Sequence, residues 1–114
     1  MQSINPYTGK VVGEYNEYTP TEVDEIIRNI DHAFHSWKQT TFEQRAQCMK
    51  NLQAKLLEKK EMLADVIVSE MGKVKREAIG EVEKCAFVCG FYAENAESFL
   101  KNEPIKTEIG RAHV

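Results

Sequence analysis

Apolar residues recur every three or four positions along most of the chain beyond residue 19, which is the spacing of amphipathic helices. The first such run starts at Thr19-Pro20-Thr21-Glu22, where a threonine cap, a proline at the first helical position and a glutamate form a capping box. The pattern predicts a helix from there to about Lys38. Its apolar stripe consists of Val23, Ile26, Ile27, Ile30, Phe34 and Trp37.

Two further periodic runs predict a second and a third helix. Thr41, with Gln44 three residues later, is another capping pair, and the helix behind it is expected to end near the charged residues 58–61. Gly72 is expected to close the third helix in the left-handed conformation, with Lys73 near the negative helix end. The buried positions are expected to be Met49, Leu52 and Leu56 in the second helix and Leu63, Val66, Ile67 and Met71 in the third.

The last helix is predicted over residues 74–100 and is apolar on two sides. Phe87 and Phe91 lie opposite its main seam, so this helix needs partners on both sides. Gly80 and Gly90 each cost about 1 kcal/mol relative to alanine in a helix, which indicates close packing at both positions. The main seam consists of Ala78, Val82, Cys85, Cys89, Tyr92, Ala96 and Phe99.

The first 18 residues are expected to be extended. Asn5-Pro6 and Thr8-Gly9 are turn signals, and residues 11–15 have strand character, as one arm of a hairpin or an edge ribbon. The expected fold class is therefore mostly α, with an N-terminal β-ribbon followed by about four helices and no strand–helix–strand unit.

Composition narrows the classes of protein that this chain can belong to. A chain of 114 residues forms at most one modest domain, too small for a cofactor domain plus a substrate domain. Its 42% hydrophobic and 29% charged residues exclude intrinsic disorder. A net charge of −3 with interleaved signs gives no basic footprint, so neither nucleic acid nor an anionic membrane is an expected partner.

No secretory signal or membrane helix is predicted, because no apolar stretch approaches the roughly 20 residues that span a bilayer. The chain holds three cysteines, an odd count that fits reduced thiols in a reducing compartment. The expected localisation is therefore cytoplasmic.

Glu77 and Glu81 are four residues apart on the last helix, so their carboxylates share a face. They could form an acid/base or metal pair. We favour a solvated charge ladder, because Lys73 and Lys84 lie at helical spacing from them.

The cysteines and histidines offer two weaker candidate sites. Cys85 and Cys89 share a helix face and could begin a zinc site or a redox pair, but no other ligands stand at the required spacing, which favours core packing. His32 and His35 could be ligands or proton carriers, yet His32 projects opposite the apolar stripe and His35 lies on its flank, so both are expected to face solvent.

The sequence contains no zinc-protease motif, dinucleotide fingerprint or P-loop. Trp37, Phe87 and Phe91 are expected in the core rather than at a cofactor. No residue of the chain is therefore assigned a catalytic, cofactor-binding or metal-binding role.

Several motifs, in this order, resemble the opening segment of aldehyde dehydrogenases from about Ile4 to Thr107. The upstream piece is Asn5-Pro6-x-Thr8-Gly9, and the most distinctive is Glu70-Met71-Gly72-Lys73 followed by Glu77-Ala78 and Glu81-Val82. Between them, the similarity rests on Trp37, Arg45 and Leu52. The segment Phe91-Tyr92-Ala93-Glu94-Asn95-Ala96-Glu97, leading to Phe99-Leu100, looks most like succinate-semialdehyde dehydrogenases. Val74 departs from the pattern, since many members have proline there.

The resemblance implies an enzyme that oxidises an aldehyde, with succinate semialdehyde expected, to its carboxylic acid with NAD or NADP. In that family a cysteine thiolate attacks the aldehyde, and a glutamate activates water to hydrolyse the thioester. Those residues and the cofactor site lie downstream of this segment in family members. Cys48, Cys85 and Cys89 are therefore not assigned as the nucleophile.

Residues 1–107 are accordingly expected to be the N-terminal segment of the cofactor-binding domain of an α/β enzyme whose full-length form is a homo-oligomer. The segment alone is expected to be inactive, to bind no cofactor and to be poorly soluble or loosely packed, with its Phe87/Phe91 side partly uncovered.

Residues 108–114 are expected to be a non-native tail. Ile109-Gly110-Arg111-Ala112-His113-Val114 is the in-frame translation of a widely used sequencing adapter, ATC GGA AGA GCA CAC GTC. The alternative is a natural hydrophilic tail.

Two alternatives to the succinate-semialdehyde enzyme stay open from the sequence. One is an aldehyde dehydrogenase of another specificity, because the substrate pocket is not encoded here. The other is a free-standing helical scaffold or binding protein that uses the same fold segment.

Overall fold

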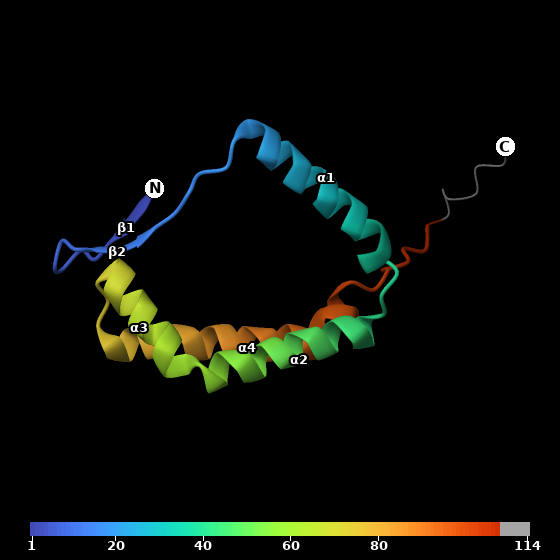
Figure 1. Ribbon diagram of the computed structural model, residues 1–114. Coiled ribbons are helices and arrows are strands. Elements are labelled where there is room, and N and C mark those ends of the chain that lie inside the picture. Colours follow the sequence, from blue (N-terminus) through green and yellow to red (C-terminus); the bar gives the residue numbers. More distant parts are fainter. Residues whose placement is uncertain (108–114) are drawn as a thin grey trace.

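The computed structural model describes residues 1–107 and contains two short strands followed by four helices (Figure 1). The mostly helical fold class with an N-terminal ribbon is therefore confirmed. The predicted non-native tail, residues 108–114, lies outside the described residues. The elements are β1 (Gln2–Ile4), β2 (Val11–Glu14), α1 (Pro20–Trp37), α2 (Phe42–Glu58), α3 (Lys60–Met71) and α4 (Lys75–Phe99).

The helix ends follow the local signals in the sequence. Thr19 Oγ1 accepts a hydrogen bond from the Glu22 amide at 3.3 Å, and the Thr19 amide donates to the Glu22 carboxylate at 2.7 Å. Thr41 and Gln44 exchange the corresponding bonds at 3.1 and 2.9 Å. Gly72 ends α3 with φ of +70°, as predicted. These ends form where they were expected because capping requires only residues close in sequence.

The core is a seam of small side chains where α4 packs against α2 and α3. In Figure 1, α2 and α4 run side by side in opposite directions, with α3 beside the first part of α4. Because these side chains are small, the helices approach closely but remove little apolar surface from water. The buried residues among those described are Ala64, Ala78, Val82, Ala86 and Cys89.

The predicted seam of α4 is wrong at several positions. Cys85 is exposed, Tyr92 is 48% exposed and Phe99 is 60% exposed, whereas Ala86 is buried in their place. The buried residues lie on a neighbouring side of the helix, rotated from the predicted centre. Periodicity identifies apolar sides of a helix, but it does not say which side a neighbour covers.

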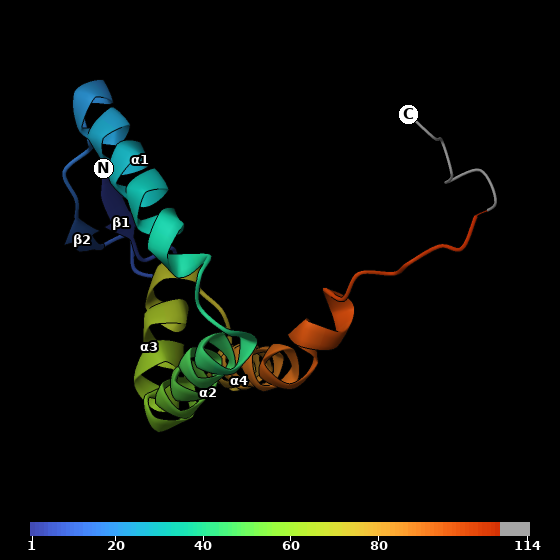
Figure 2. The same ribbon diagram turned by 90° about the vertical axis from the view of Figure 1, so that its right-hand side faces the viewer.

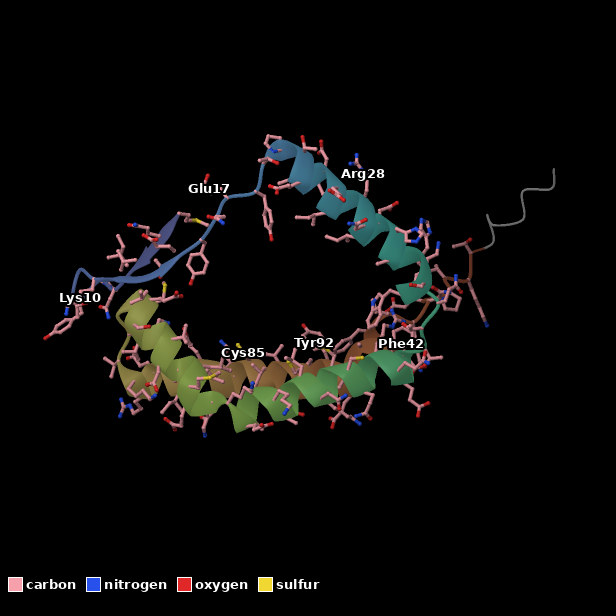
Figure 3. The ribbon with its side chains drawn as sticks, viewed as in Figure 1. Lys10, Glu17, Arg28, Phe42, Cys85 and Tyr92 are labelled. Carbon is pink, nitrogen blue, oxygen red and sulfur yellow. The ribbon has the colours of Figure 1, made fainter. Side chains whose placement is uncertain are left out.

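Helix α1 buries none of its residues and stands apart from the layer formed by α2, α3 and α4 (Figures 1 and 2). Figure 3 shows Arg28 on the outer side of α1, directed away from that layer. At about 100° per residue, the apolar stripe lies on the opposite side and faces the layer across an open space.

The expectation that Trp37, Phe87 and Phe91 lie in the core is wrong for this chain. Their exposed fractions are 49%, 68% and 40%. The second expectation, that the Phe87/Phe91 side of α4 would be left uncovered, is confirmed by the same values. No described element packs on that side of the helix.

The molecule is far more extended than a compact domain of its length. Its radius of gyration is 21.2 Å, against about 13 Å for a compact chain of roughly 100 residues. Its accessible surface is 10079 Å², against roughly 6,400 Å² for a folded monomer of this mass. Within residues 1–107, no helix has the length and apolar character needed to cross a bilayer.

The two glycines inside α4 have different surroundings. A Cβ at Gly90 would lie 2.5 Å from Nε2 of Gln53 on α2, so close packing is confirmed there. A Cβ at Gly80 would meet nothing within 4 Å, so the close packing predicted there is absent from the described part of the chain.

Substitution of these glycines tests this difference. Gly80→Ala should stabilise the chain by about 1 kcal/mol, because helix propensity improves without a steric cost. Gly90→Ala should stabilise it less or not at all, since the Gln53 side chain has to move. Urea unfolding followed by circular dichroism measures both, and an equal gain in both variants would contradict the packing at Gly90.

The unpacked state of α1 gives a second prediction. A helix without tertiary packing depends on its own capping and propensity. Thr19→Ala should therefore cost about 1 kcal/mol of α1 stability and speed amide hydrogen exchange throughout α1. Thr21→Ala, inside the same first turn, is the matched control and should leave exchange nearly unchanged.

Candidate functional site

The N-terminal hairpin meets the C-terminal end of α3. Ser3 Oγ donates a hydrogen bond to Glu70 Oε1 at 2.9 Å. The Pro6 ring lies against the backbone of Gly72, where an added Cβ would be 2.9 Å from Pro6 Cγ. Two motifs separated by more than sixty residues in the sequence thus form one junction. Their meeting was not predicted, because no local pattern joins them.

The turn of the hairpin is built by its own motif. Asn5 Oδ1 accepts hydrogen bonds from the Tyr7 amide at 2.9 Å and the Thr8 amide at 3.1 Å. Gly9 takes φ of +70°, which few other residues adopt without strain. The strands pair antiparallel, with an irregularity between Ser3 and Ile4. The asparagine and glycine therefore shape the turn that holds Pro6 against α3.

Ion pairs join α3, and the loop that follows it, to α4. Lys73 pairs with Glu81, and Lys60 lies 2.8 Å from Glu83. The charge ladder predicted for Glu81 is therefore confirmed. Glu77 lies in the first turn of α4, where a carboxylate is favourable. Lys84 makes no salt bridge within the described residues and lines an apolar groove instead.

Lys75 anchors the start of α4 to α3 through two carboxylates. It pairs with Asp65 and lies 3.3 Å from a carboxylate oxygen of Glu61. The hydrogen bond to Asp65 raises the pKa of Lys75 above its ordinary value of 10.5. A raised lysine pKa means that the contribution of the charged lysine is fully present below pH 10.5 and is lost only as the pH rises above that value. This link therefore does not change with pH in the neutral range.

The cysteines and histidines do not assemble into a site. Cys89 is buried as predicted, but Cys85 is exposed, so the expectation that both pack in the core is wrong for Cys85. His32 and His35 are exposed on α1, as predicted. Among residues 1–107, no group of three or more potential ligands could hold a metal ion. His113 belongs to the part of the chain that is not described.

Two grooves lie beside α4, and neither was predicted. One, of about 460 Å³, lies between α3 and α4 and is mainly apolar. The other, of about 380 Å³, lies between α2 and the C-terminal half of α4. Figure 3 labels one residue from each, Cys85 and Tyr92, on the side of the layer that faces α1.

Arg45 is the polar group that stands out in the second groove. Its guanidinium lies 4.6 Å from the ring centroid of Phe42, a cation–π contact. Its Nε is buried and has no hydrogen-bond partner among the described residues. Glu43, Glu94 and Glu97 line the same groove. The sequence singled out Arg45 only as part of a family pattern and gave no sign of its buried Nε.

The model of the aldehyde dehydrogenase family matches residues 1–113, almost the whole chain. This chain belongs to the aldehyde dehydrogenase family. The resemblance drawn from the motifs of residues 5–9 and 70–82 is therefore confirmed. In this member of the family, those motifs build the hairpin–α3 junction and the Lys73–Glu81 ion pair.

Several proteins similar to this chain are named succinate-semialdehyde dehydrogenases. The chain is 36% identical to the NADP-dependent succinate-semialdehyde dehydrogenase of Deinococcus radiodurans, over 98% of this chain and 24% of that protein. The crystal structure of the succinic semialdehyde dehydrogenase of Streptococcus pyogenes in complex with NADP⁺ superposes with a TM-score of 0.87 at 27% identity, over 94% of this chain and 24% of that one.

A dehydrogenase named for a different aldehyde has a segment of similar fold. The glyceraldehyde-3-phosphate dehydrogenase GapN of Methanocaldococcus jannaschii superposes with a TM-score of 0.87 at 25% identity, over 95% of this chain and 24% of that one. The chain therefore spans about a quarter of the length of the relatives it matches. Its open shape is also the shape of the corresponding segment in these longer enzymes.

The junction gives a prediction with a matched control. Gly72→Ala and Gly9→Ala both place an alanine at φ of +70°, which costs about 1–2 kcal/mol. Only Gly72→Ala also presses on Pro6, which should add about 1–3 kcal/mol and undock the hairpin. Hydrogen exchange at the α3 C-terminus and urea unfolding measure the difference. Equal losses in both variants would show that Pro6 does not pack on Gly72.

Proposed function

We propose that residues 1–107 are the N-terminal segment of a longer aldehyde dehydrogenase that oxidises succinate semialdehyde to succinate with NADP or NAD. The names of the Deinococcus and Streptococcus relatives support this substrate and cofactor class. The junction between the hairpin and α3, which is built from the family motifs, supports a scaffolding role for the segment itself.

One observation carries the proposal. The helices and strands of the chain are arranged as in the corresponding segment of a longer dehydrogenase. The apolar sides of its helices are nevertheless left uncovered. Uncovered apolar sides are expected of a segment that packs around the cofactor-binding core of a larger enzyme. A free-standing scaffold protein would be expected to cover α1 with its own residues.

The described residues themselves do not fit a dinucleotide. Arg45 is the basic side chain of the second groove, and the three glutamates lining that groove would repel a pyrophosphate. Residues 1–107 contain no glycine-rich phosphate loop. We therefore assign cofactor binding and the reactive cysteine to the remaining polypeptide, and we propose that the segment alone is inactive. A homo-oligomeric full-length enzyme is likewise part of this proposal.

The glyceraldehyde-3-phosphate enzyme supports a second candidate function. The same segment shape occurs in an enzyme named for a different aldehyde. An aldehyde dehydrogenase of other specificity is therefore the alternative to the succinate-semialdehyde enzyme.

For residues 108–114 we retain the proposal of a non-native tail. The family match runs to residue 113, so this proposal depends on the codon correspondence alone. The genomic sequence after codon 107 tests it, and a genuine stop codon after Val114 would disprove it. A frame that continues into a strand and a glycine-rich loop would instead favour the full-length enzyme.

Enzyme assays separate the proposed functions. The full reading frame should form NADPH or NADH with succinate semialdehyde at a higher kcat/KM than with acetaldehyde or glyceraldehyde 3-phosphate. The 114-residue chain should show no turnover, and calorimetric titration with NADP or NAD should show no binding. Tight binding of either nucleotide to the short chain would contradict the proposed division of roles.

A further inference from the structure

We draw no further inference here: the strongest candidate, the groove between α2 and the C-terminal half of α4 that holds the buried Nε of Arg45, carries none because nothing within residues 1–107 shows what covers it.

Discussion

Close packing through small side chains along α4 is the interaction on which the rest of the structure depends. Ala78, Val82, Ala86 and Cys89 bring α4 against α2 and α3, and Gly90 allows contact with Gln53. Such a seam fixes the relative positions of the helices but buries little apolar area. The larger apolar side chains are consequently left on other sides of the helices, where they need a partner outside this segment.

The hairpin and the ion pairs hold the ends of this layer rather than enlarging its core. Pro6 packs on Gly72, Ser3 bonds to Glu70, and Lys75 ties the start of α4 to α3. Exposed ion pairs contribute modestly to stability, so they link α3 to α4 without adding much to the free energy of unfolding. The family motifs of residues 5–9 and 70–82 thus set the geometry of this segment.

Helix α1 shows how a segment can be well specified locally and still lack a place to pack. Its capping box, Pro20 and apolar stripe all agree on a helix from Pro20 to Trp37. Agreement between local signals is typical of natural sequences and makes the helix form at the expected residues. The apolar stripe of α1 is nevertheless exposed to solvent. We propose that the remaining part of a longer enzyme covers it.

The sequence by itself determined what depends on neighbouring residues: the helix starts at Thr19 and Thr41, the stop at Gly72, the ribbon and the family motifs. Only the tertiary structure decided which side of α4 is covered, so that Ala86 is buried while Cys85 and Tyr92 are exposed. It also decided that Pro6 meets Gly72 and that Arg45 has a buried, unpartnered Nε. The physical reason is that periodicity records which residues are apolar, whereas burial depends on what lies opposite them in space.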